Sequence, residues 1–404
     1  MVGWEEGPAV DRQLRRWRRE TPGCANRAHL NNAGAALMPL AVLEAVQRHL
    51  RREAGIGGYE AADEAGAEIE AAYSAVATLL TTAPANIALT ENATAAFAQA
   101  MSAFALQRGD MIVTTRNDYI SSQILFLSMA TRYGIEVLRA ADLPDGGVDP
   151  DSVRQLIRHP RCRLVAVTWV PTNSGLVQPV EVIGKICREA GIPYVVDACQ
   201  VVGQIPIDVG RVHCDFLAAT ARKFLRGPRG IGFLYVSDAA LERGDYPLFV
   251  DMRGARWTDA DRFHPVSDAK RFENWEFAYA LVLGLGEAAL YAAGVGIDVA
   301  GARARDLAAV TRERLGALPG IRILDRGSEV CAIVSAEVAG WEGADIVSRL
   351  RERGINVSAI QREFAVIDMD EKGTRSGIRI SPHYYNTHAE IDRLADALAE
   401  LGTR

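Results

Sequence analysis

The chain has 404 residues, of which 49% are hydrophobic, and its formal net charge is −6 at pH 7. This length and apolar content can bury a sizeable core and are typical of a chain with one large and one small domain. The acidic balance and the absence of any Lys/Arg block argue against a nucleic-acid surface, and no run of about 18 uncharged apolar residues that would span a membrane is present.

The N-terminal stretch of about twenty residues is charged throughout and lacks the apolar core of a signal peptide, so we expect no export. The six cysteines are scattered without a Cys-x-x-Cys pair, which favours reduced thiols in the cytoplasm. His383 and His388 lie five residues apart with no third ligand in view, so we expect no metal site.

From about residue 80 to 240, short apolar runs alternate with longer amphipathic segments. This alternation predicts an α/β fold with a mostly parallel, seven-stranded sheet and helices on both faces. The predicted strands are Asn86–Thr90, Met111–Thr115, Ile135–Leu138, Leu164–Trp169, Tyr194–Asp197, Asp215–Ala218 and Gly232–Val236. The predicted helices between them are Ala93–Leu106, Ser121–Tyr133, Ser152–Arg158 and Val180–Ala190.

After about residue 270 the pattern changes to two long helical stretches, Phe277–Ala293 and Val299–Leu318. A smaller α+β region follows and ends in a predicted helix, Ala389–Leu401. We therefore predict an N-terminal segment over residues 1–25, a large domain over 26–265 and a small C-terminal domain over 266–404. The N-terminal segment is expected to pack near the small domain.

An aspartate and a lysine follow two of the predicted strands. Asp197 ends the strand Tyr194–Asp197, and Lys223, one of only four lysines, follows the next strand 26 residues later. Ligands bind at the carboxyl ends of strands in open α/β sheets, and this separation is about one strand–connection–strand unit. Alone, Asp197 could equally cap the following turn, but the pair predicts a site on neighbouring strand ends.

The Asp197-x-x-Gln200 motif followed by Lys223 resembles the class V aminotransferase-like family of fold-type I pyridoxal phosphate (PLP) enzymes. The resemblance extends from Leu30-Asn31-Asn32-Ala33-Gly34 to the run from Arg379 to Thr387. It implies that Lys223 carries PLP as a Schiff base and later acts as acid and base. It also implies that Asp197 pairs with the pyridine nitrogen and that Gln200 binds the phenolic oxygen.

The turn before the helix Ala93–Leu106 consists of small residues, and a helix N-terminus of this kind can bind a phosphate. The resemblance assigns that role to Ala93 and Thr94, although Asn92 or Thr94 could also simply cap the helix. It places Thr220 and Arg222 at further phosphate positions. Arg222 stands where many members have histidine.

The remaining site residues are also implied by the resemblance. Tyr119 would stack on the cofactor ring, with a plain surface turn as the alternative, and Asn173 would lie beside the phenolic oxygen unless it is only a turn residue. Arg379 would bind the α-carboxylate of the substrate rather than being a surface arginine. Asn32 and Tyr59 are expected on the substrate side.

The reaction is less well defined by the sequence than the cofactor. Cysteine desulfurases keep a mobile cysteine before the carboxylate arginine, but residues 354–364 contain none. The chain looks most like C–S lyases of small-thiol and antibiotic pathways, such as the sulfoxide lyase of ergothioneine synthesis, and like isopenicillin N epimerase. We expect β-elimination from an S-substituted cysteine. Decarboxylation coupled to oxidative deamination, epimerisation, transamination and a PLP-binding sensor without turnover stay open.

Relatives in this family build each active site across a two-fold dimer, so we expect a homodimer with active sites at its interface. The segment Arg271–Glu276 corresponds to one that reaches the partner's cofactor, although it lacks the Gly-Thr that follows the glutamate in the family. Tyr59, Glu60 and residues 354–364 are expected to line the substrate entrance.

Overall fold

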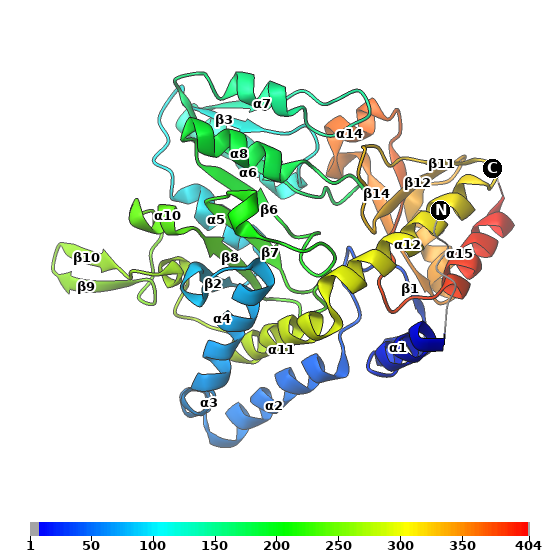
Figure 1. The fold of residues 1–404 in the computed structure, drawn as a ribbon, viewed down its shortest axis with the longest axis horizontal. Helices are drawn as coiled ribbons and strands as arrows, with labels where there is room; N and C mark the ends of the chain where they lie inside the picture. The colour runs from blue at the N-terminus through cyan, green and yellow to red at the C-terminus, as the bar shows by residue number, and fades with distance from the viewer. Residues whose placement is uncertain (1–7, 403–404) are drawn as a thin grey trace.

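A computed structural model describes residues 8–402 and is built around a seven-stranded sheet with the spatial order β2-β8-β7-β6-β5-β3-β4 (Figure 1). Neighbouring strands are parallel except at β8, which runs antiparallel to both β2 and β7. The predicted mostly parallel, seven-stranded sheet is therefore confirmed. Its strands are β2 (Ile87–Thr90), β3 (Met111–Thr114), β4 (Glu136–Arg139), β5 (Cys162–Thr168), β6 (Tyr194–Asp197), β7 (Phe216–Thr220) and β8 (Gly232–Val236).

The sheet is covered on both faces, which explains why its central strands are almost continuously apolar. Successive residues of one strand point to opposite faces, and β6 and β7 show this clearly. Val196 and Leu217 join one core cluster with helices such as α4 (Gly66–Leu80), α8 (Val180–Ala190) and α11 (Tyr279–Val295), whereas Val195 and Phe216 join a second cluster with α5 (Ala93–Ser102) and α6 (Ile120–Tyr133). The helices of this part are α4 (Gly66–Leu80), α5 (Ala93–Ser102), α6 (Ile120–Tyr133), α7 (Pro150–Leu156), α8 (Val180–Ala190), α9 (Val209–Val212) and α10 (Asp238–Glu242).

The C-terminal part has its own antiparallel sheet with the order β11-β12-β15-β14. The strands are β11 (Ile321–Ile323), β12 (Val334–Val338), β14 (Ser358–Gln361) and β15 (Ser376–Ile380), and the helices are α12 (Ile297–Gly316), α13 (Gly343–Glu352), α14 (Val366–Glu371) and α15 (His388–Leu401). The predicted smaller α+β region is therefore present. A short parallel pair, β1 (Ala28–His29) with β13 (Ile355–Asn356), links the start of the chain to it.

The N-terminal helix α1 (Pro8–Arg19) lies against the C-terminal part (Figure 1). The Trp17 ring packs edge-on against Tyr384 with 4.9 Å between centroids, and Arg18 Nη1 lies 3.0 Å from Glu390 Oε1. Helix α1 therefore packs on the C-terminal part, while residues 1–7 lie outside the described residues; the division of the chain at residue 25 stays a prediction.

Three helices form a layer below the large sheet: α2 (Leu40–Ile56), α4 and α11 (Tyr279–Val295), with the short α3 (Gly58–Glu64) at its end (Figure 1). Helix α11 follows the predicted boundary at residue 265 yet packs mainly on α2 and α4. A two-stranded hairpin, β9 (Ala255–Asp259) and β10 (Arg262–Pro265), projects from the same side of the molecule as α10. The 265 boundary itself stays a prediction.

Across residues 8–402, no single helix has both the length and the apolar content to span a membrane. Helices α11 and α12 reach that length and apolar content only when they are taken together, and their axes are bent by 79° where they meet.

The contact between α11 and α4 requires a residue without a side chain on α11. A Cβ atom at Gly286 would lie 2.7 Å from the Ala72 Cβ and 2.9 Å from its Cα, whereas one at Gly294 of the same helix would meet nothing within 4 Å. Overpacking of a close helix contact costs about 1–3 kcal/mol. Replacing an unconstrained helical glycine by alanine stabilises by up to about 1 kcal/mol.

We therefore expect Gly286→Ala to lower the Tm of the protein and the matched control Gly294→Ala to leave it unchanged or raise it. Thermal unfolding followed by circular dichroism measures both. An unchanged Tm for Gly286→Ala would contradict the close packing of α11 on α4.

Candidate active site

Lys223 and Asp197 lie at adjoining strand ends, as the sequence predicted. Asp197 is the last residue of β6 and pairs with Ala218 of β7, and Lys223 follows three residues after β7 ends. Both side chains are buried. Burial lowers the pKa of the Lys223 amine, Arg222 and Arg379 lower it further, and Cys199 and Asp197 oppose the shift. A lysine whose neutral form is favoured in this way is a nucleophile and a base.

A pocket lies next to these strand ends and is lined by Ala93, Thr94, Tyr119, Asp197 and Cys199, among others. Four residues predicted to bind the cofactor thus line one cavity. The Lys223 Nζ lies 5.8 Å from the centroid of the Tyr119 ring. The aromatic ring and the amine therefore face each other beside the cavity.

The turn that precedes α5 has the features of an anion site. Asn92 is the N-cap, and its side chain accepts a hydrogen bond from the Ala95 N–H at 2.9 Å. The first N–H groups of a helix have no partner within it and carry partial positive charge. Strand β8 approaches this turn closely: a Cβ at Gly232 would lie 3.0 Å from the Ala93 N. The capping alternative is correct for Asn92, and it leaves the N–H groups of Ala93 and Thr94 available to a phosphate.

The side chains of Thr220 and Arg222 form hydrogen bonds with backbone carbonyls of this chain. The Thr220 hydroxyl lies 3.5 Å from the Ile231 carbonyl, and Arg222 Nη1 donates to the Gly34 carbonyl. Burial lowers the pKa of Arg222, and Arg229 adds to the effect. Their contact with a phosphate stays a prediction.

Arg379 and Gln200 are buried on the other side of the site and share one neighbour, Thr172. Arg379 Nη1 lies 2.8 Å from Thr172 Oγ1, and Gln200 Nε2 lies 3.0 Å from the same atom. Burial and Arg222 lower the pKa of Arg379 to about 10, so its guanidinium is still charged at neutral pH. Gln200 Oε1, Asn173 Oδ1 and Arg379 Nε are buried without a partner in the described part of the chain. Such atoms indicate a polar ligand.

The Asn32 side chain is held by other residues of the chain. It is fully buried, donates to the Ser381 carbonyl at 2.7 Å and accepts from the Tyr385 hydroxyl, so it holds the end of β15 to the loop that follows β1. The neighbour Asn31 instead lies 3.1 Å from Arg379 Nη2. The substrate-side role of Asn32 stays a prediction, whereas Asn31 is the residue that contacts Arg379.

Tyr59 is distant from the site within one chain. It lies on α3, is 71% exposed, and α3 packs on α2 and α4.

Asn173 is buried close to the site, but its Nδ2 lies 2.5 Å from Asp368 Oδ2 of α14, which also binds Lys372 Nζ at 2.7 Å. The Asn173 side-chain oxygen Oδ1 is buried without a partner among the described residues and can accept from a ligand.

Sequence reasoning missed Asp118, which fixes the Tyr119 loop. Its buried carboxylate accepts from the Thr115 N–H at 3.0 Å and from the Thr168 N–H at 2.8 Å, and the Tyr119 N–H in turn donates to Thr168 Oγ1 at 3.0 Å. The loop is thereby tied to the ends of β3 and β5. An acidic residue directly before Tyr119, just after a strand, was the available signal.

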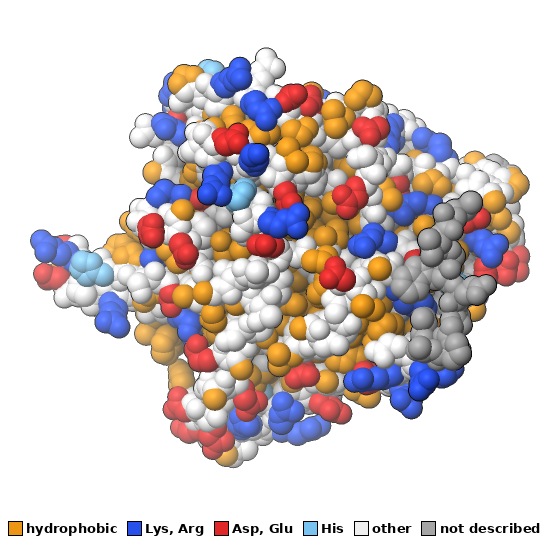
Figure 2. All heavy atoms as spheres, in the orientation of Figure 1, with side chains coloured by type: hydrophobic (Ala, Val, Ile, Leu, Met, Phe, Trp, Pro, Cys, Tyr) orange, Lys and Arg blue, Asp and Glu red, His pale blue; other side chains and the backbone are white. Residues whose placement is uncertain are grey.

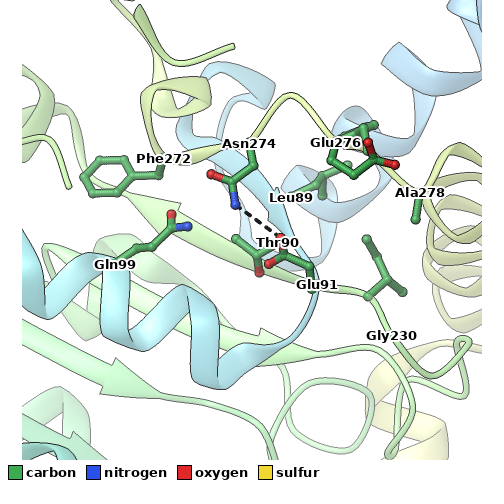
Figure 3. Close-up of a pocket in the computed structure, with 11 residues that line it drawn as sticks. Leu89, Thr90, Glu91, Gln99, Gly230, Phe272, Asn274, Glu276 and Ala278 are labelled. Atoms are coloured by element: carbon green, nitrogen blue, oxygen red, sulfur yellow. Dashed lines mark hydrogen bonds between the residues drawn. The ribbon is translucent and has the colours of Figure 1, made fainter. Parts of the chain in front are cut away.

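A second pocket lies between the end of β2 and the segment Arg271–Glu276 (Figure 3). Asn274 Nδ2 lies 3.2 Å from Glu91 Oε1 across it. The segment is anchored by Glu273, which accepts from the Leu89 N–H at 2.7 Å and the Tyr73 hydroxyl at 2.8 Å. Burial raises the pKa of Glu273 to about 7. The segment predicted to meet a partner is therefore held beside the β2–α5 turn.

Comparison with known proteins agrees with this arrangement. The family model described as aminotransferase class-V matches residues 28–394. The chain belongs to the class V aminotransferase family. A probable hercynylcysteine sulfoxide lyase of Mycobacterium tuberculosis is 29% identical over 97% of this chain and 94% of its own length. A probable cysteine desulfurase of Xylella fastidiosa is 30% identical over 92% of this chain and 90% of its own length.

Solved structures of similar proteins have the same fold. The cysteine desulfurase CsdA of Escherichia coli has a TM-score of 0.86 at 27% identity and covers 96% of this chain and 98% of its own. The cystine C–S lyase C-DES, solved with its product cysteine persulfide, has a TM-score of 0.81 at 25% identity, with 94% and 99% covered. This member of the class V aminotransferase family is a fold-type I, PLP-dependent enzyme, and its residues fit the cofactor: a buried carboxylate, an aromatic ring and a helix N-terminus line one cavity, and a buried amine lies over the aromatic ring.

We expect reduction of the holoenzyme with borohydride to attach the cofactor to the peptide that carries Lys223. Of the four lysines, Lys223 is the one at the pocket, whereas Lys270 and Lys372 bind Glu70 and Asp368 and Lys185 is exposed on α8. Peptide mass mapping identifies the labelled site. A label on any other lysine would contradict the assignment.

Proposed function

We propose that this enzyme is a C–S lyase that eliminates a thiol from an S-substituted L-cysteine in small-thiol or natural-product biosynthesis. The products would be the thiol, pyruvate and ammonia. The observation that carries the proposal is the site itself: the buried Lys223 amine, whose pKa is lowered, lies close enough to the buried Arg379 for the arginine charge to contribute to that lowering, and no cysteine with a depressed pKa accompanies them.

The chemistry follows from the chain's own groups. Bound PLP supplies an electron sink that labilises the bonds of the substrate's Cα. Arg379 is placed to bind the α-carboxylate through charge-assisted hydrogen bonds. The Lys223 amine takes the Cα proton, because its burial favours the neutral form. The C–S bond then breaks, the sulfur leaves with the bonding electron pair, and Lys223 returns a proton to it. Water hydrolyses the released aminoacrylate to pyruvate and ammonia.

The cysteines support elimination over a persulfide relay. A relay needs a nucleophilic thiolate, and thiolates form where the pKa is depressed. Burial raises the pKa of all six thiols here, Cys199 beside the pocket included. Residues 354–364, which form β13, β14 and the turn after them, contain no cysteine. The similarity to a sulfoxide lyase and to a cystine C–S lyase supports the same conclusion.

Incubating the holoenzyme with a panel of S-substituted cysteines, followed by mass spectrometry, tests the reaction. We expect a free thiol and pyruvate in equal amounts. Lys223→Ala should reduce turnover by at least about 10³-fold, because the base is lost, whereas the exposed control Lys185→Ala should retain activity. Release of carbon dioxide, a D-amino acid or a keto acid that keeps its sulfur would reject elimination in favour of decarboxylation, epimerisation or transamination.

We further propose a two-fold homodimer with the active sites at its interface. The hairpin β9–β10 projects from the body of the molecule (Figure 2). Around it, Phe249 is 82% exposed, Met252 64% and Trp257 80%. Exposed apolar clusters of this kind mark interaction surfaces. The anchored segment Arg271–Glu276 follows the hairpin directly, so a partner that covers the hairpin would also approach the β2–α5 turn.

Sedimentation velocity tests the assembly. Trp257→Asp should weaken the dimer and lower activity at low protein concentration, because it places a charge in an apolar interface. The matched control is Val182→Asp on α8, an exposed apolar residue outside the hairpin, which should leave both unchanged. A wild-type monomer with bound PLP and full activity would contradict the proposal.

A further inference from the structure

Thr172 joins the cofactor side of the site to its substrate side. It lies on the loop that follows β5 and is partly exposed, whereas Gln200 and Arg379 are buried. Gln200 Nε2 donates to Thr172 Oγ1 at 3.0 Å and to the Ala33 carbonyl at 3.1 Å. Because a carbonyl can only accept, the Ala33 contact fixes which end of the amide faces Thr172.

The hydroxyl oxygen of Thr172 is fully used as an acceptor. It accepts one N–H from Gln200 and one from Arg379 Nη1 at 2.8 Å, and a hydroxyl oxygen has two lone pairs. The Thr172 backbone carbonyl accepts from the same Nη1 at 2.9 Å. One residue therefore holds Nη1 from two sides while it also holds the glutamine amide.

Three of the N–H groups of Arg379 are used within the chain. A guanidinium has five N–H groups. Thr172 takes the two of Nη1, and Asn31 Oδ1 takes one of Nη2 at 3.1 Å. The two that remain are on Nε, which is buried and without a partner among residues 8–402, and on Nη2. Two N–H groups on neighbouring nitrogens match the two oxygens of a carboxylate.

We propose that Thr172 is a positioning residue for the α-carboxylate of the substrate. It occupies Nη1 so that the Nε and Nη2 edge of Arg379 is the edge presented to the ligand. The inference rests on the proposed role of Arg379 in carboxylate binding, not on which bond breaks afterwards. A side chain without a hydroxyl at position 172 would leave one N–H group of Gln200 and one of Arg379 unsatisfied, and Nη1 would be held from one side only, by the Thr172 carbonyl.

The test uses Thr172→Val, which keeps the shape and removes the hydroxyl, with Thr172→Ser as the matched control that keeps it. Each holoenzyme is titrated with S-methyl-L-cysteine and with 2-(methylthio)ethylamine, the same molecule without its carboxylate. The change in the visible absorbance of the cofactor reports binding, so no turnover is needed. We expect Thr172→Val to bind S-methyl-L-cysteine about tenfold more weakly, since a hydrogen bond to a charged group is lost, and to bind the amine as wild type does. Thr172→Ser should stay within about twofold of wild type for both ligands.

Two results would overturn the inference. Unchanged binding of S-methyl-L-cysteine would show that Thr172 does not set the carboxylate edge, and an equal loss for both ligands would show that it acts only on the cofactor through Gln200. If Thr172→Val did not fold or did not retain PLP, Thr172→Ala would be titrated against the same criteria. A carboxylate-selective loss in an enzyme that releases no thiol would reject the lyase function and leave the role of Thr172 standing.

Discussion

The burial of a lysine amine beside an aspartate, at the ends of two neighbouring parallel strands, is the constraint on which the rest of the structure depends. Taking an amine out of water disfavours its charged form, and only a rigid, well-packed frame can hold it there. The frame is the sheet. Residues of β6 and β7 are buried on both faces, so Asp197 and Lys223 cannot move apart without disrupting both core clusters.

Those features could be predicted from the sequence because they are local or follow from sheet topology. The strand Tyr194–Asp197 and the helix Val180–Ala190 have the predicted bounds, since continuous apolar runs and amphipathic periodicity have few alternative interpretations. The shared position of Asp197 and Lys223 follows once both strands are parallel neighbours. The antiparallel β8 was not foreseen, because an apolar strand has no local mark of its direction.

What the sequence could not reveal are contacts between distant segments. Arg379 meets Thr172 across 207 residues and Asn31 across 348. No spacing rule distinguishes Asn31 from Asn32 before the chain is folded. Which asparagine contacts Arg379 depends on the end of β15. The carbonyl of Ser381, the residue after that strand, accepts a hydrogen bond from Asn32, and the side chain of Asn31 contacts Arg379. Asp118 was missed for a related reason. Its carboxylate accepts a hydrogen bond from the Thr168 N–H, and Thr168 belongs to another strand that lies beside it only in the folded chain.

The same long-range contacts make the site sensitive to how the C-terminal part sits on the large sheet. Asp368 binds Asn173, and Glu371 pairs with Arg116 on the loop between β3 and α6, so two residues of α14 hold the loops that border the site. Burial, with Glu371 second, raises the pKa of the nearby Asp142 to about 6. Arg379 itself is on β15 of the C-terminal sheet, while Lys223 and Gln200 lie on the loops that follow β7 and β6 of the large sheet. The amine that takes a proton and the arginine that holds the substrate therefore come from different sheets. Thr172 is the residue at which the two meet, because its one hydroxyl binds a side chain from each.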